Sequence, residues 1–199
     1  VCLVNKVHYT LGRHRENDER KGWISGLGEE EGKMHPTIGG LRVGKKLDER
    51  KLNEPFDEAL EWERDGQYYH YLTKWMFALN KLSRVTDNQT YNLWAIELAK
   101  TAHSAFIYST PSGEKRMYWK MSIDLSYPLV NAMGQHDPLD GLTVYVILQL
   151  SSPKNLNWPS LDSEINDMRE ICKLADWMTS DPLGIGELLC NAYKAAQLI

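Results

Sequence analysis

The segment DPLDGLTVYVILQL, residues 137–150, decides the fold that we expect, because DPLGIGELL at residues 181–189 repeats its beginning 44 residues later. Periodicity alone does not distinguish a buried strand from a buried helix in so apolar a segment. A repeat of about 40 residues, however, is typical of arrays of two-helix hairpins. The sequence therefore predicts an all-α fold, in which each unit is an apolar helix, a turn and a helix that is apolar on one side.

Working outward from this repeat, residues 65–107 form a third and looser copy that begins DGQYYHYL. Helices that are apolar on two sides are expected in an inner layer, and helices with one polar face in an outer layer. The three copies and an amphipathic N-terminal segment together give about six helices. They are predicted at residues 1–11, 67–85, 88–106, 137–150, 160–178 and 181–199.

An aspartate stands at the start of each predicted inner helix, namely Asp65, Asp137 and Asp181. Because the three positions are equivalent in the repeat, we expect them on one rim of the helical array. Residues 13–64 and 107–136 are long interruptions that we expect to reach the same rim, and loops of this length often carry function. The rim is therefore where we look for chemistry.

The composition is that of an ordinary globular chain, since 42% of the 199 residues are hydrophobic and 25% are charged. Lys and Arg number 23 against 27 Asp and Glu, giving a net charge of −4, which argues against nucleic acid as a partner. No apolar run approaches the roughly 18 residues of a membrane span, and no signal peptide is recognisable. We expect no membrane partner.

The three cysteines, Cys2, Cys172 and Cys190, form no CxxC pair, so we expect neither a disulfide framework nor a zinc site. A reducing, cytoplasmic location fits this pattern. The chain starts with valine, and its last predicted helix runs to the final residue without a stop signal. We therefore expect one domain over residues 1–199 that is a piece of a longer protein.

The segment EWERDGQYYHY, residues 61–71, mixes acids with aromatic residues. Glu61 and Asp65 supply carboxylates, while Trp62 and Tyr68 supply flat apolar faces. Sugars present hydroxyl groups at the ring edge and C–H groups on the ring face, so this mixture suits a sugar site. The alternative is that the aspartate only caps the following helix.

The segment GQHDPLDGL holds polar groups suited to acid and base chemistry, which are Gln135, His136, Asp137 and Asp140. Glycoside hydrolysis uses two carboxyl groups roughly 5–10 Å apart, and Asp65 with Asp137 is the first pair that we expect. Because Pro138 follows Asp137, a simple helix cap is an equally good explanation of this aspartate.

The segment RMYWKMSID, residues 116–124, alternates cations with aromatic residues. Trp119, Lys120 and Asp124 could contact a sugar ring or a substrate carboxylate. The alternative is an edge loop that packs the tryptophan on the core. His70 is a possible general base or, alternatively, a core histidine with satisfied hydrogen bonds.

Other motifs are rejected. GGLRVGKK, residues 39–46, has P-loop spacing, but Lys46 stands where the magnesium-binding Ser or Thr belongs. No HExxH or GxSxG element is present. We expect neither a metal nor a cofactor.

Several of these segments together resemble an uncharacterised group of proteins similar to the six-hairpin glycosidase superfamily, the (α/α)6 toroids. The resemblance covers residues 1–199, and the segments that carry it are EWERDGQYYHYLTKW, YWKMSIDLSYP, MGQHDPLDG, HPTIGGLRVGK and DPLGIG. It implies that acids and aromatics at the rim act on sugars, and the matching positions here are Asp65, Trp119, Asp124, His136 and Asp137. About six predicted helices imply part of such a toroid.

Three functions remain in view. The first is a carbohydrate-active enzyme similar to glycoside hydrolases, with Asp65 and Asp137 as the paired carboxylates. The second is a sugar epimerase or isomerase in which His70 or His136 moves a proton. The third is a non-catalytic scaffold that binds a partner on a concave surface. The expected ligand is a carbohydrate or another small polar molecule, and the sequence does not indicate the oligomeric state.

Overall fold

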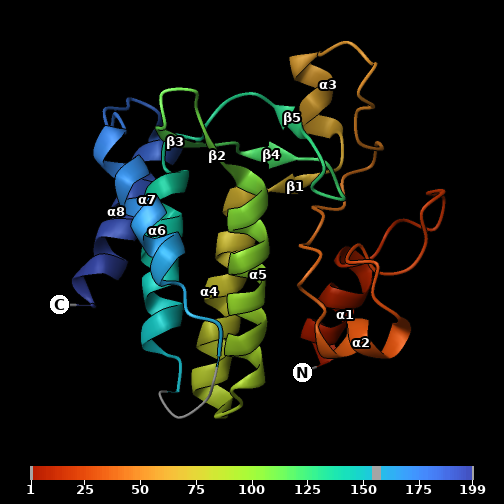
Figure 1. The fold of residues 1–199 in the computed structure, drawn as a ribbon, viewed down its shortest axis with the longest axis horizontal. Coiled ribbons are helices and arrows are strands. Elements are labelled where there is room, and N and C mark those ends of the chain that lie inside the picture. Colours follow the sequence, from red (N-terminus) through yellow and green to blue (C-terminus); the bar gives the residue numbers. More distant parts are fainter. Residues whose placement is uncertain (1, 154–157, 199) are drawn as a thin grey trace.

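The computed structural model describes residues 2–153 and 158–198, and about half of the chain is helical (Figure 1). The helices in this part of the chain are α1 (Cys2–Leu11), α2 (Glu29–Met34), α3 (Glu58–Glu63), α4 (Tyr69–Thr86), α5 (Thr90–Phe106), α6 (Asp137–Leu150), α7 (Asp162–Leu174) and α8 (Pro182–Ala196). The strands are β1 (Gln67–Tyr68), β2 (Ile107–Ser109), β3 (Lys115–Met117), β4 (Lys120–Met121) and β5 (Pro128–Val130).

All six predicted helices are confirmed, while the prediction of an all-α fold is wrong in one respect. Short strands are present, and α2 and α3 add two helices inside the segment that we expected to be a loop. Helix α7 also ends at Leu174, so Met178 lies beyond it and is exposed. Within the described residues, no helix combines the length and the apolar character needed to cross a membrane.

Helices α4, α5 and α6 form the centre of the molecule. Helix α4 packs against α5 and α6, and α6 also contacts α7 and α8. The apolar residues that these helices bury include Met76, Leu79, Ala95, Leu98, Val144, Leu148 and Met168. Burying one large apolar side chain contributes about 1.5–3 kcal/mol, so this interface stabilises the helical hairpins.

The two-helix hairpins predicted from the repeat are visible in Figure 1. Helices α4, α6 and α8 begin at the end of the molecule where the strands lie, whereas α5 and α7 run the opposite way. The predicted layering is wrong for α8, because only Gly184 and Asn191 are buried in it. Leu189 and Tyr193 on that helix are exposed.

The first two residues of the segment predicted as a helix at 67–85 and the interruption at residues 107–136 meet in a small antiparallel sheet. In it β1 pairs with β4, and β4 pairs with β5, so that Gln67 lies opposite Met121. Gly66 precedes β1 with a φ of 154°, and a Cβ at this position would lie 2.8 Å from the Met121 carbonyl oxygen. The close approach of the two chains therefore requires glycine. This sheet fixes the start of α4 beside residues 118–130.

Candidate functional site

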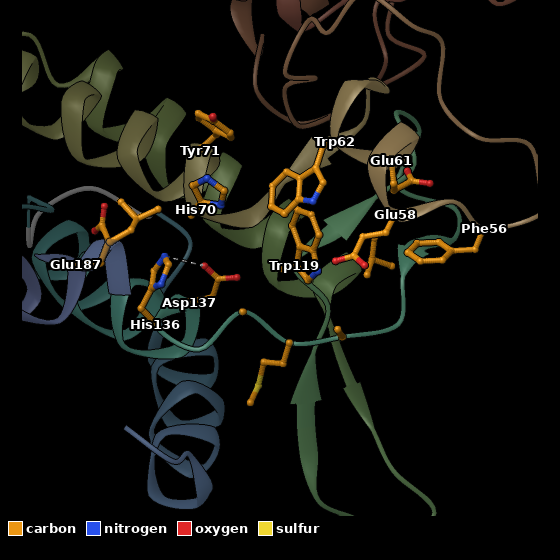
Figure 2. A pocket seen from close by; sticks show the side chains of 15 residues that line it. Phe56, Glu58, Glu61, Trp62, His70, Tyr71, Trp119, His136, Asp137 and Glu187 are labelled. Carbon is orange, nitrogen blue, oxygen red and sulfur yellow. Dashed lines mark ion pairs between the residues drawn. The ribbon is translucent and has the colours of Figure 1, made fainter. Parts of the chain in front are cut away.

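A pocket of about 620 Å³ opens at the end of the molecule where α4, α6 and α8 begin (Figure 2). Its walls come from α3, the first turn of α4, the residue before β4, the segment from β5 into α6, and α8. The polar and aromatic residues that line it are Phe56, Glu58, Glu61, Trp62, His70, Tyr71, Trp119, His136, Asp137 and Glu187. Segments that are remote in the sequence therefore share one cavity.

Asp137 is the most unusual of these residues, because its carboxyl group is buried without compensation. It is 1% exposed, and its Oδ1 has no hydrogen-bond partner among the described residues. The nearest basic atom is Nε2 of His136 at 3.7 Å. Burial, helped by the negative charge of Asp140, raises the pKa of Asp137 to about 8. At neutral pH this group is therefore mostly protonated and able to donate a proton.

Asp140, one turn further along α6, is in the opposite situation. Its Oδ2 accepts hydrogen bonds from Thr73 and from Lys74 Nζ, the latter at 3.0 Å, and its Oδ1 accepts one from Lys194 Nζ at 3.2 Å. Burial would raise the pKa of this carboxyl, but the two lysines and the threonine outweigh burial and lower it. Asp140 is thus a charged group behind the pocket wall and does not line the pocket.

Two histidines lie on the same side of the pocket as Asp137. The ring centroids of His70 and His136 are 6.2 Å apart. Burial lowers the pKa of His70 to about 4, so its imidazole is neutral at pH 7. His136 is the residue at the N-terminal boundary of α6, and its side chain makes no capping hydrogen bond. Both rings are therefore available to a ligand.

A flat aromatic surface forms the middle of the pocket. The rings of Trp62 and Trp119 are stacked with centroids 5.0 Å apart and planes inclined by 29°. Tyr68 supports Trp119 from behind, edge to face, at 5.3 Å. Trp62 is half exposed, as is Tyr71 on the neighbouring wall. Such surfaces pack well against the C–H face of a sugar ring.

A buried ion-pair network holds the stacked tryptophans together. Lys120 is fully buried, and its Nζ donates to Oε1 of Glu61 at 2.7 Å. Arg50 Nε donates to Oε2 of the same glutamate at 3.0 Å. Because Glu61 belongs to α3 and Lys120 to β4, the network fixes Trp62 against Trp119. It supports the pocket and leaves little of the Glu61 carboxylate free for a ligand.

Glu187 on α8 is a carboxylate that the sequence analysis missed. Its Oε2 accepts a hydrogen bond from Lys74 Nζ at 2.6 Å. Its charge also contributes to raising the pKa of Asp137, after burial and Asp140. Its only sequence signal is that it is the sole acidic residue of α8, in a helix that repeats the start of α6. Phe56 and Glu58 were missed as well, since they belong to a segment without a motif.

The structure does not bring Asp65 into the pocket. This carboxylate is fully buried, where it accepts a hydrogen bond from Arg42 Nη1 at 2.9 Å and from the amides of Gly44 and Gly66 at 2.8 and 3.0 Å. It does not cap α4, which begins after Tyr68. The expected pair of Asp65 with Asp137 is therefore not assembled around this cavity, because an arginine distant in the sequence binds the first of them.

Other predicted residues are also placed elsewhere. Asp124 accepts hydrogen bonds from two loop serines and forms an ion pair with Arg20 at 3.3 Å. The Gln135 amide donates to the Met178 carbonyl at 2.6 Å. The predicted residues that do not line the pocket are Asp65, Tyr68, Lys120, Asp124, Gln135 and Asp140, and those that line it are Glu61, Trp62, Trp119, His136 and Asp137.

In the part of the chain that the structure describes, no group of three or more His, Cys, Asp or Glu side chains is arranged to hold a metal ion. Comparisons with protein-family models, with curated proteins and with solved structures find no match. Any functional conclusion therefore depends on the geometry of the pocket.

Proposed function

We propose that this protein is a carbohydrate-active enzyme similar to glycoside hydrolases and that Asp137 is its general acid. The helical hairpins formed by α4 to α7 and the start of another at α8 support a partial (α/α)6 toroid as its architecture. One observation carries the proposal: a protonated carboxyl with a free oxygen shares a pocket with stacked tryptophans. A sugar ring on the tryptophans would have an acid beside it.

In such a reaction Asp137 would donate its proton to the glycosidic oxygen as the bond to the sugar carbon breaks. A second carboxyl must stay ionised to activate water or to attack the sugar carbon. Glu187 is the best candidate, because it lines the same pocket and its carboxylate forms an ion pair with Lys74. It takes the position in the pair that the sequence analysis gave to Asp65.

The test is hydrolysis of a panel of aryl glycosides and unmodified oligosaccharides. Turnover is measured as the release of new reducing ends. We expect Asp137→Asn to lower kcat by about 10²–10⁴-fold, which is the usual contribution of a general acid. Asp181→Asn is the matched control, because Asp181 also stands at a helix start but does not line the pocket. Equal turnover by the Asp137→Asn variant and the wild type would contradict the proposal.

A second candidate, sugar epimerisation, is favoured by the two histidines. An unprotonated imidazole can accept a proton from carbon, and His70 and His136 share one wall of the pocket. Incubation of aldoses in deuterated water would then place deuterium on carbon, as detected by NMR. His70→Asn should abolish this exchange, whereas Asp181→Asn should not. Absence of exchange with every aldose tested would remove this candidate.

A further inference from the structure

The pocket has two chemically different ends (Figure 2). His70, His136, Asp137 and Glu187 gather at one end, whereas Phe56 and Glu58 lie at the other, with the stacked tryptophans between them. The proposed hydrolysis uses only the first end and the aromatic surface. The second end has no role in that reaction, and its composition indicates what else the ligand carries.

Charge distinguishes the second end. Among the described lining residues there are four acidic side chains and no lysine or arginine. Three of the acids are compensated: Glu61 by Lys120 and Arg50, Glu187 by Lys74, and Asp137 by holding its proton. The fourth, Glu58, forms no ion pair or side-chain hydrogen bond with any residue described. The net charge that the wall presents to a ligand is therefore negative.

The aromatic residues strengthen this preference. The faces of tryptophan attract cations through the ring quadrupole, and the attraction grows when the cation is partly removed from water. Trp62 and Trp119 line the pocket with Glu58, and Phe56 forms the adjoining wall. Phe56 already has the Arg50 guanidinium 5.8 Å from its centroid, but Arg50 is held by Glu61 and by the Leu129 carbonyl. That guanidinium lies outside the pocket lining.

We propose that Glu58, Trp62 and Trp119 form a subsite for a positively charged group and that the substrate is an amine-bearing sugar, such as a glucosamine oligosaccharide. This inference rests on the proposed sugar-cleaving function and adds the substrate class. Uronic acids and sugar phosphates are disfavoured, because the lining holds no cation to balance their charge. Neutral sugars keep the stacking contact but lose the attraction to the carboxylate and to the indole faces.

A structural role for Glu58 accounts for only part of this arrangement. Glu58 is the first residue of α3, where a negative charge stabilises the helix dipole, and Asp57 already caps this helix by accepting from the Leu60 amide. Glu63, at the other end of α3, is also exposed but does not line the pocket. It therefore provides a matched control, being an acid on the same helix outside the cavity.

The experiment compares three trisaccharides. The β-1,4-linked glucosamine trimer carries positive charges, cellotriose is neutral, and trigalacturonate carries negative charges. Binding is measured by tryptophan fluorescence and calorimetry at pH 6. The Asp137→Asn variant is used because this substitution blocks the proposed turnover. We expect the glucosamine trimer to bind about fivefold to thirtyfold more tightly than cellotriose, as a cation over an indole face predicts. Trigalacturonate should bind most weakly.

Glu58→Gln should reduce the preference for the glucosamine trimer by about twofold to fivefold, because the indole faces remain, and Glu63→Gln should leave the preference unchanged. Equal binding of the glucosamine trimer and cellotriose would overturn the subsite, even if neutral glycosides are hydrolysed. Choline binding as tightly as the glucosamine trimer would overturn the assignment to a sugar. If the amine preference falls in Glu58→Gln but the wild type hydrolyses no glycoside, the subsite is supported and the hydrolase is contradicted.

Discussion

Asp65 and Asp137 make the most instructive comparison in this molecule. Both stand near the start of a long helix, and both are almost completely buried. Asp65 has an arginine and two backbone amides as hydrogen-bond partners, whereas Oδ1 of Asp137 accepts no hydrogen bond from a described residue and has the His136 ring at 3.7 Å. Two aspartates that are equivalent in the repeat therefore have opposite environments.

The difference shows that partners, more than burial, decide the role of a buried carboxyl group. A carboxylate removed from water is costly unless it is paired, and Arg42 offsets that cost for Asp65. Without such a partner Asp137 reduces the cost by keeping its proton, which gives the pocket an acid. The ion pair with Arg42 gives Asp65 a structural role. The absence of such an ion pair leaves Asp137 protonated and able to donate its proton.

The sharpest way to test the comparison is Asp65→Asn, because it leaves the partly buried Arg42 without its charge partner. We expect the free energy of unfolding to fall by about 3–5 kcal/mol, as measured by urea denaturation. The control is Asp48→Asn, which breaks an ion pair with Arg15 in which the aspartate is 72% exposed. That change should cost less than about 1 kcal/mol. Equal losses for the two variants would mean that Asp65 is not a structural anchor.

The second test concerns the pH dependence of stability at Asp137. Between pH 5 and 7.5 this aspartate keeps a proton in the folded protein, since its pKa is about 8, but loses it on unfolding. At this group the folded state then binds more protons than the unfolded state, so the contribution of Asp137 to stability falls as the pH rises.

Asp137→Asn removes this proton linkage. The stability of the variant relative to the wild type should therefore increase by about 1 kcal/mol per pH unit over that range, as measured by urea denaturation at several pH values. A stability difference that does not change with pH would show that Asp137 is ionised in the folded protein, and the contrast with Asp65 would disappear.

The smallest effect is expected at Asp181, the third aspartate of the repeat. It is the N-cap of α8, and its Oδ2 accepts a hydrogen bond from the Gly184 amide at 2.7 Å. Asp181→Ala should cost about 1 kcal/mol and speed hydrogen exchange in the first turn of α8. Asp181→Asn should be close to neutral, because asparagine caps equally well. A loss of several kcal/mol would assign Asp181 a role beyond capping.

Local patterns explain why the helices were predictable and the strands were not. The apolar run of α6 and the repeat of its first residues in α8 predicted the bounds of both helices to within a few residues. Strands β1, β4 and β5 are two or three residues long and carry no periodic signal. They form because Gln67 meets Met121, a pairing that no local propensity encodes.

The site was predictable to a similar degree. His136 and Asp137 line the pocket because they stand at the start of α6, and Trp119 lines it because it precedes β4. Trp62 joins them because the contact of Glu61 with Lys120 holds α3 beside the small sheet. Glu187 was not predictable as a lining residue, since its place depends on how α8 packs against α6.

By itself, the sequence determined the long helices and their arrangement in hairpins, because helical periodicity and short turns depend on residues a few positions apart. Only the tertiary structure decided which aspartate would be paired. Arg42 and Asp65 are 23 residues apart, and Lys74 and Asp140 are 66 apart, so folding alone brings each cation to its acid. The charge state of a buried group is set by such long-range neighbours, whose positions a helical repeat does not encode.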